Sequence, residues 1–582
     1  MKKFSFLFLS LALFGQIASA IPADPRPFKY TQPDGTVITL RLMGDEFDHW
    51  TVDENTGNEV VLDGDGYYRP VSGVYRSARL APAQVNSLRS RAAEFRSYNA
   101  HRDLTHGERK IPVILMQFSD LEFTLDNPVQ QFTDLLNKKG YSANGGTGSV
   151  QDYYRDNSHG KFVPVFDVLP VVTLSKSYKY YGQDGYDTDV HVGEAIVEAI
   201  QLSDPLADFS QYDSDGDGYV DMLMVYYAGH NQAEHAPDYT IWPHQSGVST
   251  DEQFDGVYFG TYFCTSEYKG SAGTRMCGIG TSSHEFGHSL GLPDFYDTDY
   301  GKNGSAHAMD EFSIMCSGSY NNEGRTPPYF TSEERKILGW MDEQIEIYGS
   351  GPLTIESIDN NVAYYTTTDV EGEYFVYEAR LDNGWDEALS EYGLLVYHVD
   401  KSTAHSVAGM ACKYHWDYWQ YRNDLNAYGS HPMCYVIPAG SQSNLDYYGY
   451  DWLFGNIEKT YVPKSWSGDD TRYSFYDITI NADNVSMNVV DLLHDGQDEG
   501  LAKLGYNSIA DPGKGNYSAG DKFELKLNAS RRYLPSSTKW YLDGKRVTGE
   551  SISLVSGQHT IKAELTISST TSEVVELEIN VN

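Results

Sequence analysis

The stretch from His284 to Asp294 constrains this chain more than any other part of its sequence. Its residues, HEFGHSLGLPD, place two histidines four positions apart. Residues at that spacing lie on one face of an α-helix, so the imidazoles of His284 and His288 can bind one metal ion from the same side. Glu285 then lies beside the ion, where its carboxylate can take a proton from a metal-bound water.

The residues after the second histidine predict a turn that supplies a third ligand. Gly291 allows the chain to leave the helix sharply, and Pro293 prevents the helix from resuming. The turn brings Asp294 round to the metal, and three protein ligands with one open position suit zinc. A downstream glutamate, Glu311 or Glu323, is the alternative third ligand, but the turn at Gly291 would then have no purpose.

The histidine pair alone is a moderate signal, because a surface helix with two unconnected histidines explains it as well as a metal site does. A second pattern strengthens it. Ser313–Gly318, with the sequence SIMCSG, has small and turn-forming residues around Met315. In metzincin zinc peptidases a methionine turn forms a hydrophobic floor beneath the metal. Met315 by itself would more often be core packing, but beside the ligand motif it predicts such a turn.

Several segments closely resemble the immune inhibitor A family of secreted bacterial metallopeptidases. They are HEFGHSLGLPDFYD, FSIMCSGSY, TSEERKILGW, IPVILMQFSD (111–120), GSVQDYYRDNSHGKF (148–162), YDSDGDGYVD (212–221) and GLLVYHVD (393–400), and together they span about residues 108–490. The resemblance implies the same zinc ligands, His284, His288 and Asp294, with Glu285 as the general base and Met315 in the turn. Most metzincins have a histidine where this chain has Asp294.

The chain is long enough for about three to four domains. We expect a multidomain α+β protein built around an α/β zincin (metzincin-like) catalytic domain. The expected parts are a signal peptide at 1–20, a propeptide at 21–107, the zinc metallopeptidase catalytic domain at 108–344, an associated β-rich domain at 345–495 and a C-terminal immunoglobulin-like β-sandwich at 496–582.

The N-terminus has the features of a secretory signal peptide. A positive start at Met1-Lys2-Lys3 precedes the apolar run Phe4–Phe14 and a small-residue end at Ala20, where we expect cleavage. The apolar run is too short to span a membrane. We therefore expect a secreted protein (extracellular, periplasmic or on the surface of a bacterium) with no membrane span.

The formal net charge is −39, and loss of the two lysines of the signal would make it −41. So acidic a surface repels phosphate backbones and argues against nucleic-acid binding. Most of these carboxylates are expected to be solvated surface groups, although some can bind hard cations.

The five cysteines of an exported chain allow two disulfides and one free thiol. Proximity in sequence favours Cys264 with Cys277 and Cys412 with Cys434, which leaves Cys316. A bridge at Cys277 would brace the active-site helix, since it lies seven residues before the first histidine of the motif.

Residues 21–107 form a distinct first unit, turn-rich at first and then helical over Pro82–Tyr98. It resembles the propeptide of related exported peptidases. The unit has no cysteine, so one of its carboxylates, such as Asp45, Asp48 or Asp53, is the candidate to fill the open metal position. A permanent accessory domain is the alternative. We expect cleavage between about Arg91 and Lys110, where basic residues are frequent.

The pattern from Ile111 onward alternates strand and helix, as in an α/β peptidase core. Expected strands are Ile111–Phe118, Val163–Leu174 and Met222–Ala228, and expected helices are Val129–Asn137, Val150–Asn157, Glu194–Leu202 and Thr281–Leu290. The segment Tyr226–Gly229 could lie along the zinc cleft and pair with an extended substrate, although an ordinary sheet edge explains it equally well.

A second metal signal lies in the sequence DSDGDGYVD, with Gly218 at the sixth position as in an EF-hand calcium loop. The twelfth position is Met224 rather than Glu, so the copy is incomplete. We expect a structural calcium ion, because so many adjacent carboxylates are costly without a cation. The expected ligands are Asp213, Asp215, Asp217, Asp221 and the carbonyl of Tyr219.

Beyond Trp340 the pattern is mostly that of strands, with an aromatic-rich middle from Cys412 to Trp452. Aromatic density can mark a glycan platform, although packed sheets account for it more often. Strand signals in the last unit, at Lys522–Leu527, Thr538–Leu542 and Val574–Val581, resemble an immunoglobulin-like sandwich. We expect this unit to serve adhesion or spacing, with glycans or a cell surface as candidate partners, and the whole chain to be a monomer.

The expected activity is zinc-dependent hydrolysis of peptide bonds in protein or peptide substrates. Glu285 takes the proton of the attacking water and passes it to the leaving amine. Tyr320, which follows the methionine turn, is a candidate oxyanion donor, although a structural hydroxyl is equally consistent. Two other classes remain: an inactive surface-binding or adhesion protein on a peptidase scaffold, and a zinc hydrolase that does not act on peptides.

Overall fold

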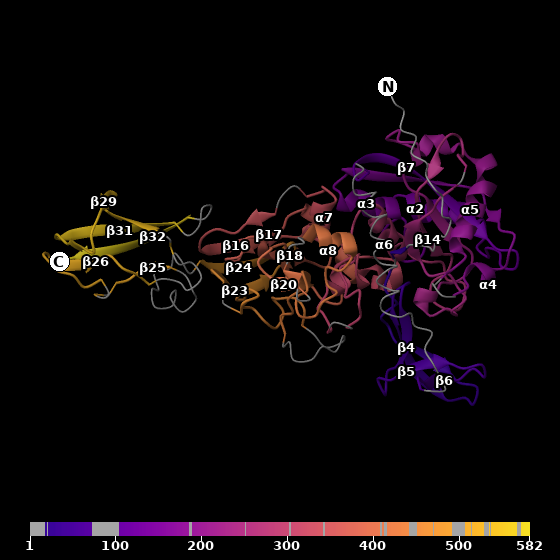
Figure 1. Cartoon of the computed structure of the whole chain (residues 1–582), viewed down its shortest axis with the longest axis horizontal. Coiled ribbons are helices and arrows are strands. Elements are labelled where there is room, and N and C mark those ends of the chain that lie inside the picture. The colour runs from indigo at the N-terminus through magenta and orange to yellow at the C-terminus, as the bar shows by residue number, and fades with distance from the viewer. Residues whose placement is uncertain are drawn as a thin grey trace, which may run out of the picture. The chain divides into compact units, whose positions relative to one another are not determined.

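The computed structural model places most of the chain (Figure 1). It describes residues 18–19, 21–72, 104–184, 189–250, 252–301, 304–341, 344–407, 410–411, 416–440, 451–468, 471–491, 507–511, 513, 515–528, 535, 537–566 and 572–582. The expected signal peptide, apart from Ala18 and Ser19, and the expected helix Pro82–Tyr98 lie outside these residues. Among them, no helix has both the length and the apolar character that crossing a bilayer requires.

The described chain divides into two compact units. The first comprises Met1–Glu343, Asp382–Ser390 and Tyr414–Tyr435, and the second comprises Gln344–Leu381, Glu391–Lys413 and Val436–Asn582. Two segments beyond residue 344 therefore pack with the first unit. The domain boundaries expected from the sequence stay predictions.

The first unit begins with a sheet of five strands in sequence order. The strands are β2 (Phe28–Thr31), β3 (Val37–Gly44), β4 (His49–Asp53), β5 (Glu59–Leu62) and β6 (Tyr68–Pro70), and each pairs antiparallel with the next. The turn between β3 and β4 is unusual, because residues 44–48 are buried although hairpin tips normally face solvent.

A second sheet of the first unit carries the candidate site. Its order is β1-β12-β14-β11-β7-β8, with β9 also paired to β7. The strands are β1 (Ala18–Ser19), β7 (Gly107–Gln117), β8 (Phe162–Val168), β9 (Val172–Thr173), β11 (Met224–Tyr227), β12 (His244–Gly247) and β14 (Thr261–Ser266). Strands β8, β7, β11 and β14 are parallel, whereas β12 runs antiparallel to β14, and β1 antiparallel to β12.

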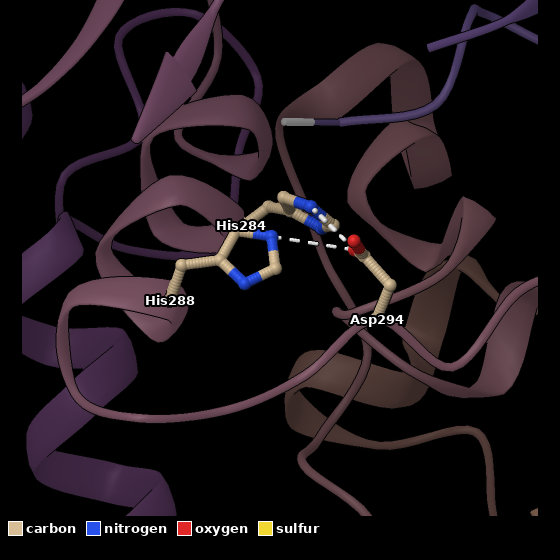
Figure 2. A group of neighbouring side chains, drawn as sticks. All are labelled: His284, His288 and Asp294. Carbon is tan, nitrogen blue, oxygen red and sulfur yellow. Dashed lines mark ion pairs between the residues drawn. The ribbon is translucent and has the colours of Figure 1, made fainter. Parts of the chain in front are cut away.

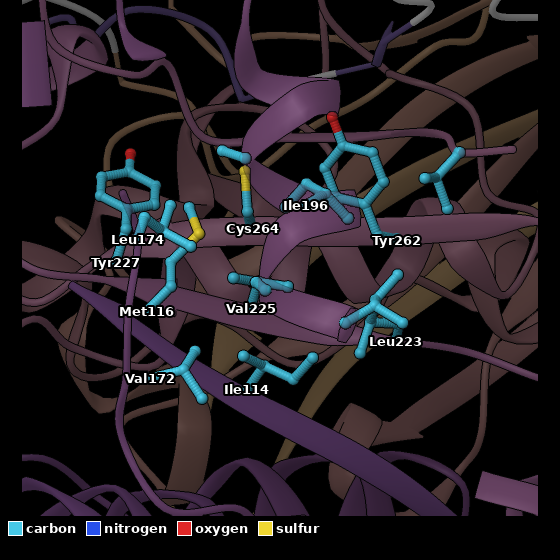
Figure 3. Packing of buried hydrophobic residues seen from close by; sticks show 14 of the residues in the cluster. Ile114, Met116, Val172, Leu174, Ile196, Leu223, Val225, Tyr227, Tyr262 and Cys264 are labelled. Atoms are coloured by element: carbon cyan, nitrogen blue, oxygen red, sulfur yellow. The ribbon is translucent and has the colours of Figure 1, made fainter. Parts of the chain in front are cut away.

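One face of this sheet forms a continuous apolar core (Figure 3). Ile114 from β7, Val225 from β11 and Cys264 from β14 are fully buried there with Ile196 from helix α5 (Val192–Ser203). Because parallel strands are covered on both faces, they are apolar almost throughout, which explains the run IPVILM that predicted β7.

The expected helices and strands of this region agree largely with the structure. Helices α2 (Pro128–Asn137), α3 (Val150–Asn157) and α5 match their expected ranges within two residues, and Ser149 and Asp152 form a capping box that fixes the start of α3. The single strand expected at Val163–Leu174 is wrong. It is two strands, β8 and β9, separated by a segment that contains Pro170, which cannot donate a ladder hydrogen bond.

The expected position of Tyr226–Gly229 beside a bound substrate is also wrong. Strand β11 lies between β7 and β14 and has no free edge, and the side chains of Tyr226 and Tyr227 are fully buried. At one end of this sheet, β12 is covered only by the two-residue strand β1.

The second unit consists mainly of antiparallel strands. One sheet has the order β15-β17-β18-β19-β22 and another β16-β24-β23. These strands are β15 (Ile345–Glu346), β16 (Gly351–Glu356), β17 (Tyr364–Thr367), β18 (Glu373–Arg380), β19 (Gly393–Asp400), β22 (Cys434–Val436), β23 (Tyr473–Ile480) and β24 (Asn484–Asp491). A shared apolar core joins β16, β18, β19, β23 and β24.

The C-terminal strands form a separate core. A sheet of order β29-β28-β31-β32 packs with the short pairs β26-β30 and β25-β27. The strands are β25 (Ser508–Ile509), β26 (Lys522–Glu524), β27 (Leu527–Asn528), β28 (Ser537–Leu542), β29 (Lys545–Val547), β30 (Ser551–Ser553), β31 (Gly557–Thr566) and β32 (Ser572–Val581). The strands expected at Thr538–Leu542 and Val574–Val581 are present, whereas the single strand expected at Lys522–Leu527 is wrong, because it is the two short strands β26 and β27. The immunoglobulin-like identity stays a prediction.

Candidate metal centre

Helix α6 (Gly280–Ser289) carries the two histidines and is buried on every side. It begins one residue before its expected start and ends one residue before its expected end. Full burial requires small residues wherever another segment crosses the helix. A Cβ on Gly280 would lie 1.9 Å from the carbonyl oxygen of Ser319, and one on Gly287 would lie 2.6 Å from Sδ of Met315. The expected methionine turn therefore packs directly against α6, between the positions of its two histidines.

The side chains of His284, His288 and Asp294 converge on one point (Figure 2). Nε2 of each histidine lies 3.3 Å from Oδ1 of Asp294. Nδ1 of His284 lies 2.8 Å from the carbonyl oxygen of Ile314, and Nδ1 of His288 lies 2.9 Å from that of Leu292. A carbonyl only accepts, so each Nδ1 carries the proton and each Nε2 lone pair faces the point of convergence.

The surroundings of Asp294 hold its carboxylate ionised and oriented. Gly291 has a φ of +105°, which confirms the expected turn out of the helix. Asn423 accepts from the backbone N–H of Asp294 at 2.6 Å, and its side-chain amide donates to Oδ2. Burial raises the pKa of Asp294, but His288 and His284 outweigh this effect and hold the pKa below its usual range.

These residues fit a divalent cation. Nε2 of His284 and Oδ1 of Asp294 are buried, and among the described residues neither has a hydrogen-bond partner. Buried polar atoms without partners are costly unless an ion binds them. Two imidazoles and one carboxylate with an open fourth position are the donor set of a catalytic zinc site.

The alternative third ligands lie elsewhere. The carboxylate of Glu311 accepts from the backbone N–H of Ser390, and Glu323 pairs with Arg275 and Arg325. Neither belongs to the group of converging ligand atoms. The geometry therefore favours Asp294.

Glu285 lies beside this point and is fully buried. Its Oε1 accepts the backbone N–H of Ile21 at 2.8 Å, whereas Oε2 has no hydrogen-bond partner among the described residues. Burial raises the pKa of Glu285 to about 8, although His284 and the Ile21 N–H act in the opposite direction. A carboxylate whose pKa is near neutrality can both accept and return a proton.

The segment from Ile21 to Asp24 passes through the site, which the sequence did not predict. The indole N–H of Trp242 donates to the carbonyl of Ile21 at 3.0 Å, and the backbone N–H of Asp24 donates to the carbonyl of Ala233 at 2.9 Å. Strand β1 just before it is paired with β12. The hydroxyl of Tyr320, the candidate oxyanion donor, donates to the carbonyl of Pro22 at 2.6 Å.

Among the candidate carboxylates of the first unit, Asp45 and Asp48 are buried in the tip of the β3–β4 hairpin. Asp45 accepts the backbone N–H groups of Phe47 and Asp48, so it stabilises the turn itself. Asp53 likewise accepts backbone N–H groups of its own turn. Glu46 interacts electrostatically with the candidate site. Burial raises the pKa of Glu46 well above its usual range, and the nearby charges of Asp45, Asp294 and Glu285 add to this effect.

The aspartate-rich loop lies between residue 212 and β10 (Tyr219–Val220). Asp213, Asp215 and Asp221 bring one carboxylate oxygen each within 4.8 Å of one another. Asp217 is outside this group, and its Oδ1 accepts the backbone N–H of Tyr219. The loop is thus compatible with a cation, but only three of the four expected carboxylates converge.

The expected disulfide between Cys264 and Cys277 is wrong. Both cysteines are free and buried, Cys264 in β14 within the apolar core. Cys316 and Cys434 are free and buried as well, and Cys412 lies outside the described residues. Proximity in sequence was misleading here, because the core takes up the Cys264 side chain as a small apolar group.

Comparison with known proteins supports a peptidase. Residues 104–344 match the family model of the immune inhibitor A peptidase M6 catalytic domain. The pre-pro-metalloprotease PrtV of Vibrio cholerae serotype O1 is 27% identical over 311 residues, which cover 45% of this chain and 33% of PrtV. Immune inhibitor A of Bacillus thuringiensis subsp. alesti is 25% identical over 273 residues, which cover 39% of each chain. The match thus spans between a third and two fifths of these relatives.

A search of solved structures found OgpA from Akkermansia muciniphila, at 11% identity and a TM-score of 0.24, over 81% of this chain and 92% of OgpA. So low a score supports no conclusion about the fold or the chemistry of this chain.

Proposed function

Because residues 104–344 belong to the immune inhibitor A family of metallopeptidases, we propose that this chain is a secreted zinc-dependent endopeptidase. The observation that carries the proposal is the convergence of His284, His288 and Asp294 beside a buried glutamate. Two imidazoles, one carboxylate and an adjacent general base form the minimum set for hydrolysis by a metal-activated water.

The roles of the residues follow from their positions. Zinc bound by this set would lower the pKa of a bound water toward roughly 7 and polarise the scissile carbonyl. Glu285 takes a proton from the attacking water and delivers it to the leaving amine. The backbone nitrogen of Ile21 supports this role, since it lies 2.8 Å from Oε1, where a leaving amine would receive its proton.

Substrate is expected to bind along β12. Strand β12 pairs with the two-residue strand β1, which lies in the expected signal peptide, so removal of the signal peptide would leave β12 at the edge of the sheet. Strand addition gives an extended peptide main-chain hydrogen bonds at such an edge. The pairing of β1 with β12 supports the same path. Tyr320 would then bind a substrate carbonyl beyond the scissile bond, because its hydroxyl donates to Pro22 rather than to the residue before Ile21.

The first unit acts as a propeptide in this proposal. Its segment Ile21–Asp24 covers the general base, and the buried hairpin tip with Glu46 lies beside Asp294 and Glu285. A peptide substrate cannot reach Glu285 while this segment is in place. Activation then requires release of the unit, with cleavage expected between about Arg91 and Lys110. N-terminal sequencing of fully active secreted enzyme checks this, and Ile21 as its first residue would rule it out.

Several finer points belong to the proposal. Asp213, Asp215 and Asp221, with Asp217 and the carbonyl of Tyr219, are proposed to hold a structural calcium ion. Export by a signal peptide, a monomeric state, and binding of glycans or a cell surface through residues 496–582 complete it. Adhesion by an inactive peptidase scaffold stays the alternative.

The direct test uses the secreted full-length protein after its own processing. We expect it to digest casein, to lose this activity with phenanthroline and to regain it with added zinc. Elemental analysis should give about one zinc per chain. A protein that lacks stoichiometric zinc and leaves casein intact would support the adhesion alternative instead.

A further inference from the structure

The segment Ile21–Arg26 lies in the candidate site in the manner of a bound peptide. Its main chain is held by Glu285, Trp242 and the carbonyl of Ala233, through the nitrogen of Ile21, the oxygen of Ile21 and the nitrogen of Asp24. Main-chain hydrogen bonds fix a peptide regardless of its sequence. Any sequence preference at this end of the cleft must therefore come from the side chains that the segment meets.

Asp24 meets a buried lysine. The side chain of Lys269 is 4% exposed, and its Nζ lies 3.9 Å from Oδ2 of Asp24 and 2.9 Å from Oε2 of Glu234. The ammonium also lies 4.8 Å above the ring of Tyr320, the residue that binds the carbonyl of Pro22. Lys269 is thus attached to the same wall of the cleft that holds the main chain of the segment.

Glu234 alone does not fully compensate the charge and the N–H donors of the Lys269 ammonium. The ammonium has three N–H donors, and its contacts with Glu234 and Asp24 are ion pairs without good hydrogen-bond geometry. Oε2 of Glu234 is shared, because it also accepts the backbone N–H of Gly270 at 2.6 Å. A buried ammonium is costly unless carboxylates surround it, and Asp24 supplies the second one.

We propose that Lys269 forms an anionic subsite of the cleft, filled by Asp24 in this structure and by an acidic substrate side chain in the processed enzyme. The proposal rests on the peptidase function proposed above. The residue whose nitrogen faces Glu285 is the first residue after the scissile bond, and Ile21 takes that position here. The preferred substrate therefore carries Asp or Glu three residues after it.

Arg26 also interacts with Asp24, which affects the expected strength of the acidic preference. Its guanidinium donates to both oxygens of Asp24, with Nε at 2.8 Å from Oδ1, and its side chain is 42% exposed. The segment thus supplies part of the charge compensation itself. In a substrate without this arginine, the acidic side chain would interact with Lys269 alone. The preference of the enzyme for an acidic residue at this position should therefore be at least as strong as the contact in this structure suggests.

The test compares fluorogenic peptides that share Ala-Ile at the scissile bond and differ only three residues after Ile, where they carry Asp, Asn or Lys. None contains arginine. Processed wild-type enzyme should cleave the Asp peptide with a kcat/KM about tenfold above that of the Asn peptide, and the Lys peptide more slowly still. Equal rates for Asp and Asn would overturn the subsite, although the peptidase function would stand.

Removing Lys269 alone would leave Glu234 buried without its cation, so the protein variant is K269M combined with E234Q. This pair of substitutions should abolish the preference, so that the ratio of kcat/KM for the Asp peptide to that for the Asn peptide falls from about tenfold to about one, whatever the variant's overall rate. Persistence of the tenfold preference would overturn the assignment to Lys269.

A binding measurement keeps the subsite testable without turnover. A labelled peptide with the sequence of residues 21–26 should bind the metal-free processed enzyme, and its D24N form about tenfold more weakly by fluorescence anisotropy. The two peptides should bind the K269M/E234Q variant equally. If the wild-type protein cleaves neither casein nor peptides, the peptidase function fails, and this measurement still decides on Lys269.

Discussion

The backbone nitrogen of Ile21 lies 2.8 Å from the carboxylate of Glu285, 264 residues further along the chain. The residue proposed to move the proton in catalysis thus accepts a hydrogen bond from the segment proposed to block access to it. Inhibition by such a segment depends on main-chain geometry rather than on a metal-binding side chain, which explains why no single carboxylate or thiol in residues 21–107 identified it.

Replacing Glu285 tests the general base. Glu285→Gln should lower kcat for casein or peptide cleavage by about 10²–10⁴-fold, because a neutral amide cannot accept the proton of the attacking water. Zinc content should stay at the wild-type level, since Glu285 is not a ligand in the arrangement described. The control is Glu311→Gln, whose carboxylate lies outside the converging group. Substantial proteolysis by the Glu285 variant would exclude the assigned role.

Asn423 should control metal affinity although it is not a ligand. Asn423→Ala removes the amide that donates to Oδ2 of Asp294 and the oxygen that accepts its backbone N–H. Loss of such an orienting partner typically weakens metal binding by about 10–100-fold. Competition with a zinc chelator measures this. Asn456→Ala, at an exposed position of the second unit, should leave the affinity unchanged.

Gly287 should be intolerant of a side chain. A Cβ there would lie 2.6 Å from Sδ of Met315, which is fully buried beneath α6. Gly287→Ala is expected to reduce the free energy of unfolding by about 1–3 kcal/mol, as overpacking does in closed cores. Urea denaturation checks this. Gly260→Ala provides the comparison, because its added Cβ would meet only the ring of Tyr219 at an ordinary 3.5 Å.

Chelation of calcium should destabilise the protein. If the aspartate-rich loop holds calcium, EGTA should lower the melting temperature by about 5 °C, because an ion that binds only the folded state stabilises it. A variant with both D213N and D215N should melt at the lower temperature with or without EGTA. A wild-type melting curve that EGTA leaves unchanged would contradict the calcium site.

Asp310 should make stability depend on pH. Burial, together with Glu311, raises its pKa to about 7, above the value of about 3.8 expected in the unfolded chain. The folded protein therefore binds this proton more tightly, so the contribution is present below pH 4 and is lost as the pH rises toward 7. Asp310→Asn should remove about 1–2 kcal/mol of this decline between pH 4 and 8 in urea denaturation. An unchanged pH profile would show that the pKa of Asp310 is not raised in the folded protein.

Local features were predictable from the sequence because each depends on neighbouring residues. The helix periodicity placed His284 and His288 on one face, and Gly291 with its φ of +105° produced the turn to Asp294. The apolar run of β7 and the capping box of α3 were equally local signals. The turn around Met315 was recognisable for the same reason, although its contact with Gly287 was not.

The strand expected at Val163–Leu174 was wrong for a local reason, Pro170, whereas the disulfide and the position of β11 depended on residues distant in the chain. Cys264 and Cys277 are close in sequence, but the core of the sheet buries the first as an apolar group. The sequence of β11 does not show whether the strand lies at the edge or in the centre of the sheet. Its central position follows from its pairing with β7 on one side and β14 on the other. The sequence of a single strand does not show which other strands it pairs with in the sheet.

The sequence by itself determined that His284, His288 and Asp294 converge beside Glu285, since helix pitch and one glycine turn bring them together within a short stretch. Only the tertiary structure decided that Asn423 contacts Asp294, that Asp294 and Glu285 help to raise the pKa of Glu46, and that Ile21 and Asp24 contact Glu285 and Lys269. These contacts join segments more than 100 residues apart. No local pattern of residue types encodes which distant segments come into contact in this way.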